Sequence, residues 1–107
     1  MALTRDFKQT IVERVEREPA FANALLDEAA TSFLNGEPDV ARLILRDLVN
    51  ATIGFEQLAV ITHKPSKSLH RMLSSKGNPG MDSLAAIFDA VRRFLNVGIK
   101  VRTVKAG

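Results

Sequence analysis

The stretch FEQLAVITHKPSKSLHRML, residues 55–73, decides the fold, and SSKGNPG follows it directly. It contains two short segments with apolar residues at helical spacing, which a Lys64-Pro65 step separates. The residue before a proline is pushed out of the α region, whereas proline itself suits the first turn of a new helix. The pattern therefore predicts one helix over 55–62 and a second from residue 65 to 74 or 75.

The remaining sequence predicts further helices on both sides of this pair. Pro19 and Pro38 stand where a proline starts a helix, and Gly36 stands where a glycine ends one. Apolar residues at spacings of three and four support each segment. The predicted helices cover 4–17, with Thr4 as N-cap and Phe7, Ile11 and Val15 on one face, 19–35, 38–53, and a last helix with Leu84, Ile87, Phe88, Val91 and Leu95 on one face.

The C-terminal residues 97–107 change period. Val97, Ile99 and Val101 are separated by single residues, as in a half-buried strand. A single strand cannot satisfy its own backbone edges, so it would pair with the same strand of a second copy. The alternative is a frayed extended tail.

The composition indicates one folded domain. The 107 residues are 46% hydrophobic and 25% charged, which is ordinary for a globular protein and unlike a disordered chain. The absence of cysteine excludes disulfides, thiolate metal sites and cysteine nucleophiles. No run without a charged residue exceeds eight residues, whereas a membrane span needs ~20 apolar residues. We therefore expect a soluble, cytoplasmic protein without membrane contact.

Charge is divided unevenly along the chain. Residues 1–53 carry six Lys/Arg and nine Asp/Glu, a net charge of −3, whereas residues 54–107 carry nine and three, a net charge of +6. Such a division suggests that the two halves have different partners. The alternative is that surface charges segregate by chance.

A helical hairpin over 55–75 would present one apolar and one polar face. The apolar face holds the two helices together, and a small residue at Ala59 lets them approach closely. The inner residues are Leu58, Ala59, Leu69 and Met72. The polar face suits the major groove of DNA, where arginine binds guanine, and lysine and hydroxyl groups reach phosphates or base edges. The candidate DNA-binding residues are Gln57, Lys64, Ser66, Lys67, Ser68, His70, Arg71, Ser74, Lys76 and Asn78.

The segment from Asp39 to about Asn96 resembles the XRE or lambda-repressor-like helix-turn-helix family. The matching motifs are FEQLA, the break, SKSLHRML and GNPGMDSLAAIFDAV. More narrowly, the segment is similar to addiction-module antidote proteins, whose recognition helix is also followed by a GNP loop. The resemblance implies a nucleoid-associated regulator that binds double-stranded operator DNA as a homodimer through residues 66–74, represses its own operon and acts as an antitoxin.

The expected architecture is all-α. It is a lambda-repressor-like helix-turn-helix bundle with two extra N-terminal helices and a short C-terminal strand. Residues 1–36 would form an extension that packs on the core and contacts a toxin or a second copy, 37–96 the DNA-binding domain, and 97–107 a tail or dimerisation strand. Many such toxins are small basic proteins, which an acidic extension suits. The alternatives are a free-standing regulator without a toxin and a non-catalytic adaptor that binds only protein.

Two positions depart from the family's usual pattern. His63 stands in the turn where family members usually have glycine, and Phe55 stands where glutamine often supports the phosphate backbone. Without that glutamine, Lys64 or Gln57 is the expected phosphate contact. His63 must adopt a left-handed conformation at some energetic cost, or the turn must have another shape. We favour the second, because Pro65 already fixes the start of the next helix.

The sequence gives little support for catalysis or metal binding. His63 and His70 are seven residues apart, so they do not form the i, i+4 pair that metal sites favour. Ser66, Ser68 and His70 do not share one helical face, and no Gly-x-Ser-x-Gly elbow is present. We therefore expect no enzymatic activity, no metal and no cofactor.

Overall fold

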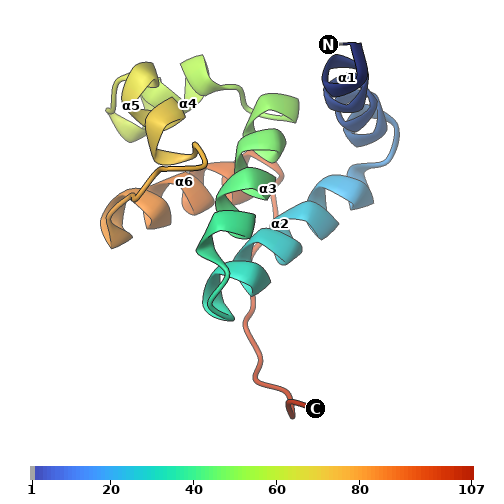
Figure 1. The fold of residues 1–107 in the computed structure, drawn as a ribbon, viewed down its shortest axis with the longest axis vertical. Coiled ribbons are helices and arrows are strands. Elements are labelled where there is room, and N and C mark those ends of the chain that lie inside the picture. Colours follow the sequence, from blue (N-terminus) through green and yellow to red (C-terminus); the bar gives the residue numbers. More distant parts are fainter. Residues whose placement is uncertain (1) are drawn as a thin grey trace.

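The computed structural model describes the backbone of residues 2–107 and the side chains of residues 9–107. Over these residues the chain is all-α, as predicted (Figure 1). The helices are α1 (Ala2–Arg17), α2 (Pro19–Leu34), α3 (Pro38–Ala51), α4 (Phe55–Thr62), α5 (Ser66–Met72) and α6 (Met81–Phe94). α1 already begins at Ala2, so the prediction that Thr4 is its N-cap is wrong, whereas the side chain of Phe7, predicted on its apolar face, lies outside the described part. No helix in this part is long and apolar enough to cross a membrane.

Proline and glycine set most of the helix boundaries. Pro19 and Pro38 occupy the first positions of α2 and α3, where a missing N–H removes no helical hydrogen bond. After α2, Gly36 adopts a φ of 86°, as a glycine at a helix end does. These positions confirm the predicted starts of α2 and α3 and the predicted stop after α2. Other predicted bounds differ from the structure: α3 ends two residues earlier than predicted, at Ala51, and α5 starts one residue later than predicted and already ends at Met72.

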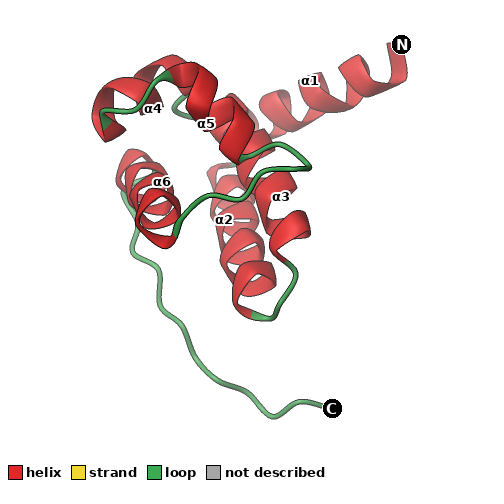
Figure 2. Ribbon diagram, turned by 60° about the vertical axis from the view of Figure 1, so that its left-hand side comes forward, coloured by secondary structure: helices red, strands yellow, loops and turns green. Residues whose placement is uncertain are grey.

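The helices α2, α3, α4, α5 and α6 share one apolar core. The helices α2 and α3 lie side by side and make the most extensive contact between any two helices of the described part, with α4, α5 and α6 beside them (Figure 2). Each of the five helices contributes buried residues to the same cluster. The largest fully buried side chains are Leu45, Leu48, Leu58, Leu69, Leu73, Ile87, Val49 and Val91.

The first helix is attached to this core. It packs against both α2 and α3, and Val15 lies partly buried against the core cluster. The Arg14 guanidinium lies over the Phe21 ring, 4.3 Å from its centroid, and its Nε is 3.4 Å from the Glu18 carboxylate. The second of these contacts is exposed to solvent, so burial of the apolar residues fixes α1 more than the ion pair does.

Residues 97–107 are extended and form no strand. A strand requires a neighbour that exchanges backbone hydrogen bonds with it, and the single chain does not provide one. The sequence allowed either a strand paired with a second copy or an extended tail for these residues. In the single chain they form the extended tail. Val97 and Ile99 pack against the core, whereas Val101 and Val104 are 64% and 75% exposed. In both views the tail leaves the molecule at the end opposite α4 and α5 (Figures 1 and 2).

Candidate nucleic-acid interface

Apolar side chains hold α4 and α5 together. Leu58 of α4 and Leu69 of α5 are completely buried. Ala59 and Met72 are half-buried against the same cluster, and Phe55 at the start of α4 is 6% exposed. Helices of eight and seven residues are not stable in isolation. Their conformation therefore depends on this burial and on the segments that close their ends.

The turn between α4 and α5 passes through a left-handed residue. His63 has φ 57° and ψ 38°. The backbone N–H groups of His63 and Lys64 both donate to the carbonyl oxygen of Ala59, at 3.2 Å in the case of Lys64. The prediction of a differently shaped turn is therefore wrong. The last carbonyls of a helix need donors, and a left-handed residue just after the helix supplies them; histidine adopts this region more readily than most residues.

The side of α5 that faces away from the core is basic and open to solvent. Lys67, His70 and Arg71 are exposed, whereas Ser66 and Ser68 are half-buried. Among the side chains that the structure describes, none forms an ion pair with the cations of α5 and its two flanks, which are Lys64, Lys67, Arg71 and Lys76. Their positive charges are therefore available to an anionic partner.

The His70 ring packs against an aromatic residue of α4. The rings of Phe55 and His70 are stacked, with centroids 3.9 Å apart and planes 20° apart. His70 remains exposed although one face of its ring is covered. From the sequence, Phe55 is notable only as a missing glutamine, because its partner lies fifteen residues away on another helix. The stack limits the directions that the imidazole can adopt.

A compact turn closes the C-terminal end of α5. The Ser74 hydroxyl, a candidate DNA contact, donates to the carbonyl oxygen of Arg71 at 2.7 Å. Gly77 is buried, and its N–H donates to the carbonyl oxygen of Ser74 at 3.0 Å. A β-carbon at Gly77 would collide with the backbone oxygens of Arg71 and Met72. The turn that follows α5 therefore requires a residue without a β-carbon at position 77.

Two candidate residues lie beside hollows that no residue of α5 lines. Gln57 lines a hollow between α4 and α6 together with Ile61 and Phe94. Asn78 is exposed and borders a hollow formed with residues of α2, α3 and α6. Lys64, two residues before α5, lines neither hollow.

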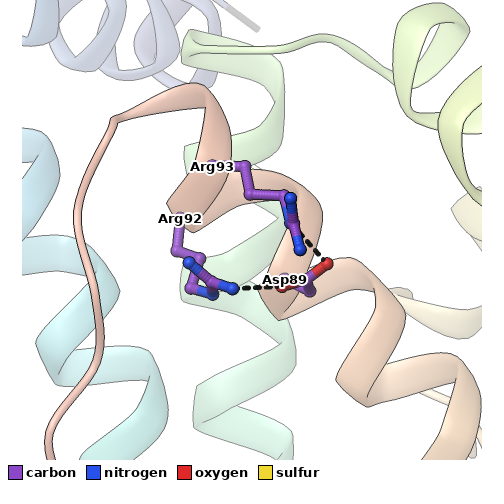
Figure 3. Close-up of polar contacts among 3 residues, drawn as sticks. All are labelled: Asp89, Arg92 and Arg93. Carbon is purple, nitrogen blue, oxygen red and sulfur yellow. Dashed lines mark hydrogen bonds and ion pairs between the residues drawn. The ribbon is translucent and has the colours of Figure 1, made fainter.

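The basic residues of the C-terminal half fall into three groups. Three of the nine lie in the tail, residues 97–107, at the end opposite α5 (Figure 1). Arg92 and Arg93 both bind the carboxylate of Asp89, at 2.8 Å and 2.9 Å (Figure 3). The remaining four are the cations of α5 and its flanks. Four of the nine basic residues of this half thus lie on or beside α5, without an ion pair to any described side chain.

Comparison with known proteins does not supply a function. No protein-family model, no curated protein and no solved structure matches the chain. Within the part of the chain that the structure describes, no group of three or more His, Cys, Asp or Glu side chains has the arrangement of a metal site. Function must therefore be inferred from the geometry and charge described above.

Proposed function

We propose that the chain is a sequence-specific DNA-binding transcriptional regulator of the XRE or lambda-repressor type. In this proposal α4 and α5 are the helix-turn-helix, and α5 enters the major groove. The observation that carries the proposal is the cluster of Lys64, Lys67, Arg71 and Lys76 on and around an exposed helix whose other side is buried. Half or more of all protein–DNA hydrogen bonds go to phosphates and sugars, so such a cluster provides affinity as well as position.

The exposed residues of α5 and its flanks are expected to make different kinds of DNA contact. Arg71 is the expected base reader, since a guanidinium binds guanine in a bidentate manner. Lys67 and Lys64 are expected to contact phosphates, which adds affinity without sequence information. The ring of His70 is stacked on Phe55, and we expect it to enter the groove in a restricted orientation.

We further propose that the regulator acts as a homodimer and as the antitoxin of a toxin–antitoxin module. Operators for such proteins are two-fold symmetric, and a dimer matches this symmetry. The acidic side chains of α1, α2 and their junction are exposed and suit a small basic toxin. These residues are Glu13, Glu16, Glu18, Asp27 and Glu28. A free-standing regulator differs only in having no toxin, which co-purification with the product of the adjacent reading frame would test.

A binding experiment tests the DNA proposal. Fluorescence anisotropy would compare a duplex from the chain's own promoter with an unrelated duplex of equal length, at salt concentrations from about 50 to 200 mM. Arg71→Ala should weaken operator binding by about 1–3 kcal/mol and relax preference at one base position. Lys67→Ala should weaken binding to both duplexes and reduce the salt slope by about one.

The matched control is Arg93→Ala, because Arg93 is an exposed arginine that is bound to Asp89 on its own helix. This variant should leave both affinities unchanged. If Arg71→Ala and Lys67→Ala also leave operator affinity unchanged, α5 is not the recognition helix. If the wild-type protein binds neither duplex at low salt, the protein-binding adaptor is the better function. The exposed apolar side chains of Ile61 and Phe94, 47% and 55% accessible, favour that second candidate.

A further inference from the structure

Arg42 of α3 reaches across to the turn that follows α5. Its Nε donates to the carbonyl oxygen of Ser74 at 3.2 Å, and its Nη2 donates to that of Ser75 at 3.3 Å. Both oxygens lie just beyond the end of a helix, where carbonyl groups lack helical partners and attract positive charge. One planar guanidinium thus binds two successive carbonyl oxygens that are 32 and 33 residues away in sequence.

Leu73 at the start of this turn is buried in the core, whereas the other hydrogen bonds of the turn lie within it or join it to α5. The Gly77 N–H bonds the Ser74 carbonyl oxygen, and the Ser74 hydroxyl bonds that of Arg71. These bonds shape the turn but do not join Ser74 and Ser75 to any helix other than α5. Arg42 supplies that connection, since it lies on α3, whose buried residues belong to the core. The start of the turn is therefore held by the burial of Leu73, and Ser74 and Ser75 are held by a side chain outside the proposed helix-turn-helix.

We propose that Arg42 is a positioning residue for DNA binding, which holds the 73–77 turn so that Lys76 stays beside the exposed side of α5. This inference rests on the proposed function. Arg42 is half-buried, and two of its guanidinium nitrogens already donate to backbone oxygens. It therefore acts on DNA through Lys76 and not as a phosphate contact of its own.

The first test needs no DNA. Amide hydrogen exchange of residues 73–77 should be faster in Arg42→Met than in the wild type, because the bonds of Ser74 and Gly77 lose their external support. Arg93→Met is the matched control and should leave this exchange unchanged. Arg42→Lys keeps the charge but lacks the planar fork that binds two oxygens, and it should also exchange faster. Wild-type exchange in both Arg42 variants would overturn the inference, whether or not the protein binds DNA.

The second test is a double-mutant cycle on operator affinity. Arg42→Met should weaken binding by about tenfold, whereas in a Lys76→Ala background the same change should cost less than about threefold, because coupled residues are not additive. In a Lys64→Ala background the full loss should remain, since Lys64 lies at the other end of α5. Equal losses in all three backgrounds would show that Arg42 contacts a phosphate itself, which would overturn the positioning role. Arg42→Lys repeats the cycle if Arg42→Met does not fold, as thermal unfolding would reveal.

Discussion

Replacing His63 by glycine should stabilise the protein. His63 has φ 57° and ψ 38°, a conformation that costs most residues with a β-carbon roughly 1–2 kcal/mol. Glycine avoids this cost but loses roughly 0.5–1 kcal/mol through the greater entropy of its unfolded chain. The His63 side chain is exposed and forms no hydrogen bond with the described residues. Its removal should therefore cost little free energy of unfolding. Subtracting the two terms leaves a net gain for His63→Gly of about 0–1.5 kcal/mol, with a midpoint near 0.75 kcal/mol.

Thermal and urea unfolding would measure this gain. For a domain of this size 1 kcal/mol corresponds to a Tm change of about 4 °C, so the midpoint corresponds to a rise of about 2–4 °C. The matched control is His63→Ala, which keeps the β-carbon and should unfold within about 0.5 kcal/mol of the wild type. A glycine variant that is no more stable than the alanine variant would refute the claim that backbone strain is concentrated at this turn. Operator affinity should stay unchanged in both variants, because His63 is not a proposed DNA contact.

Two further outcomes are expected. Gly77→Ala should destabilise the protein by about 2 kcal/mol or more, because its β-carbon has no space against the last carbonyl oxygens of α5. Gly80→Ala, where a β-carbon meets no atom within 4 Å, is its control in the same unfolding assay, and equal effects would contradict the steric reason. Truncation after Lys100 should convert the proposed dimer to a monomer in sedimentation experiments, because it removes the exposed Val101 and Val104 but leaves Ile99 on the core. A truncated chain that still sediments as a dimer would place the interface elsewhere.

The helices were predictable because local signals are strong in this sequence. Pro19 and Pro38 fix the starts of α2 and α3 by removing a backbone donor and setting φ. The spacing of Leu84, Ile87 and Val91 gives α6 a single apolar side, and all three are buried. These signals act over a few residues, so they need no knowledge of the fold.

The features that the sequence did not reveal depend on contacts between distant residues. The stack of Phe55 on His70 and the bonds from Arg42 to Ser74 join different helices, and no spacing rule connects them. The turn at His63 was wrongly predicted for a different reason. The need of the Ala59 carbonyl oxygen for donors outweighed the intrinsic preference of a residue with a β-carbon.

These contacts together determine how α5 is presented. A helix of seven residues cannot maintain its own orientation, so its two ends must be fixed by other parts of the chain. At the first end the backbone N–H groups of His63 and Lys64 donate to the Ala59 carbonyl oxygen of α4, and at the second end Arg42 binds the carbonyl oxygens that follow α5. Substitutions that break the bonds at these two ends should therefore alter DNA affinity without removing any DNA contact, whereas His63→Gly and His63→Ala keep the backbone donors and leave it unchanged. Separating orientation from contact requires that each α5 variant be compared with a variant of one of these ends.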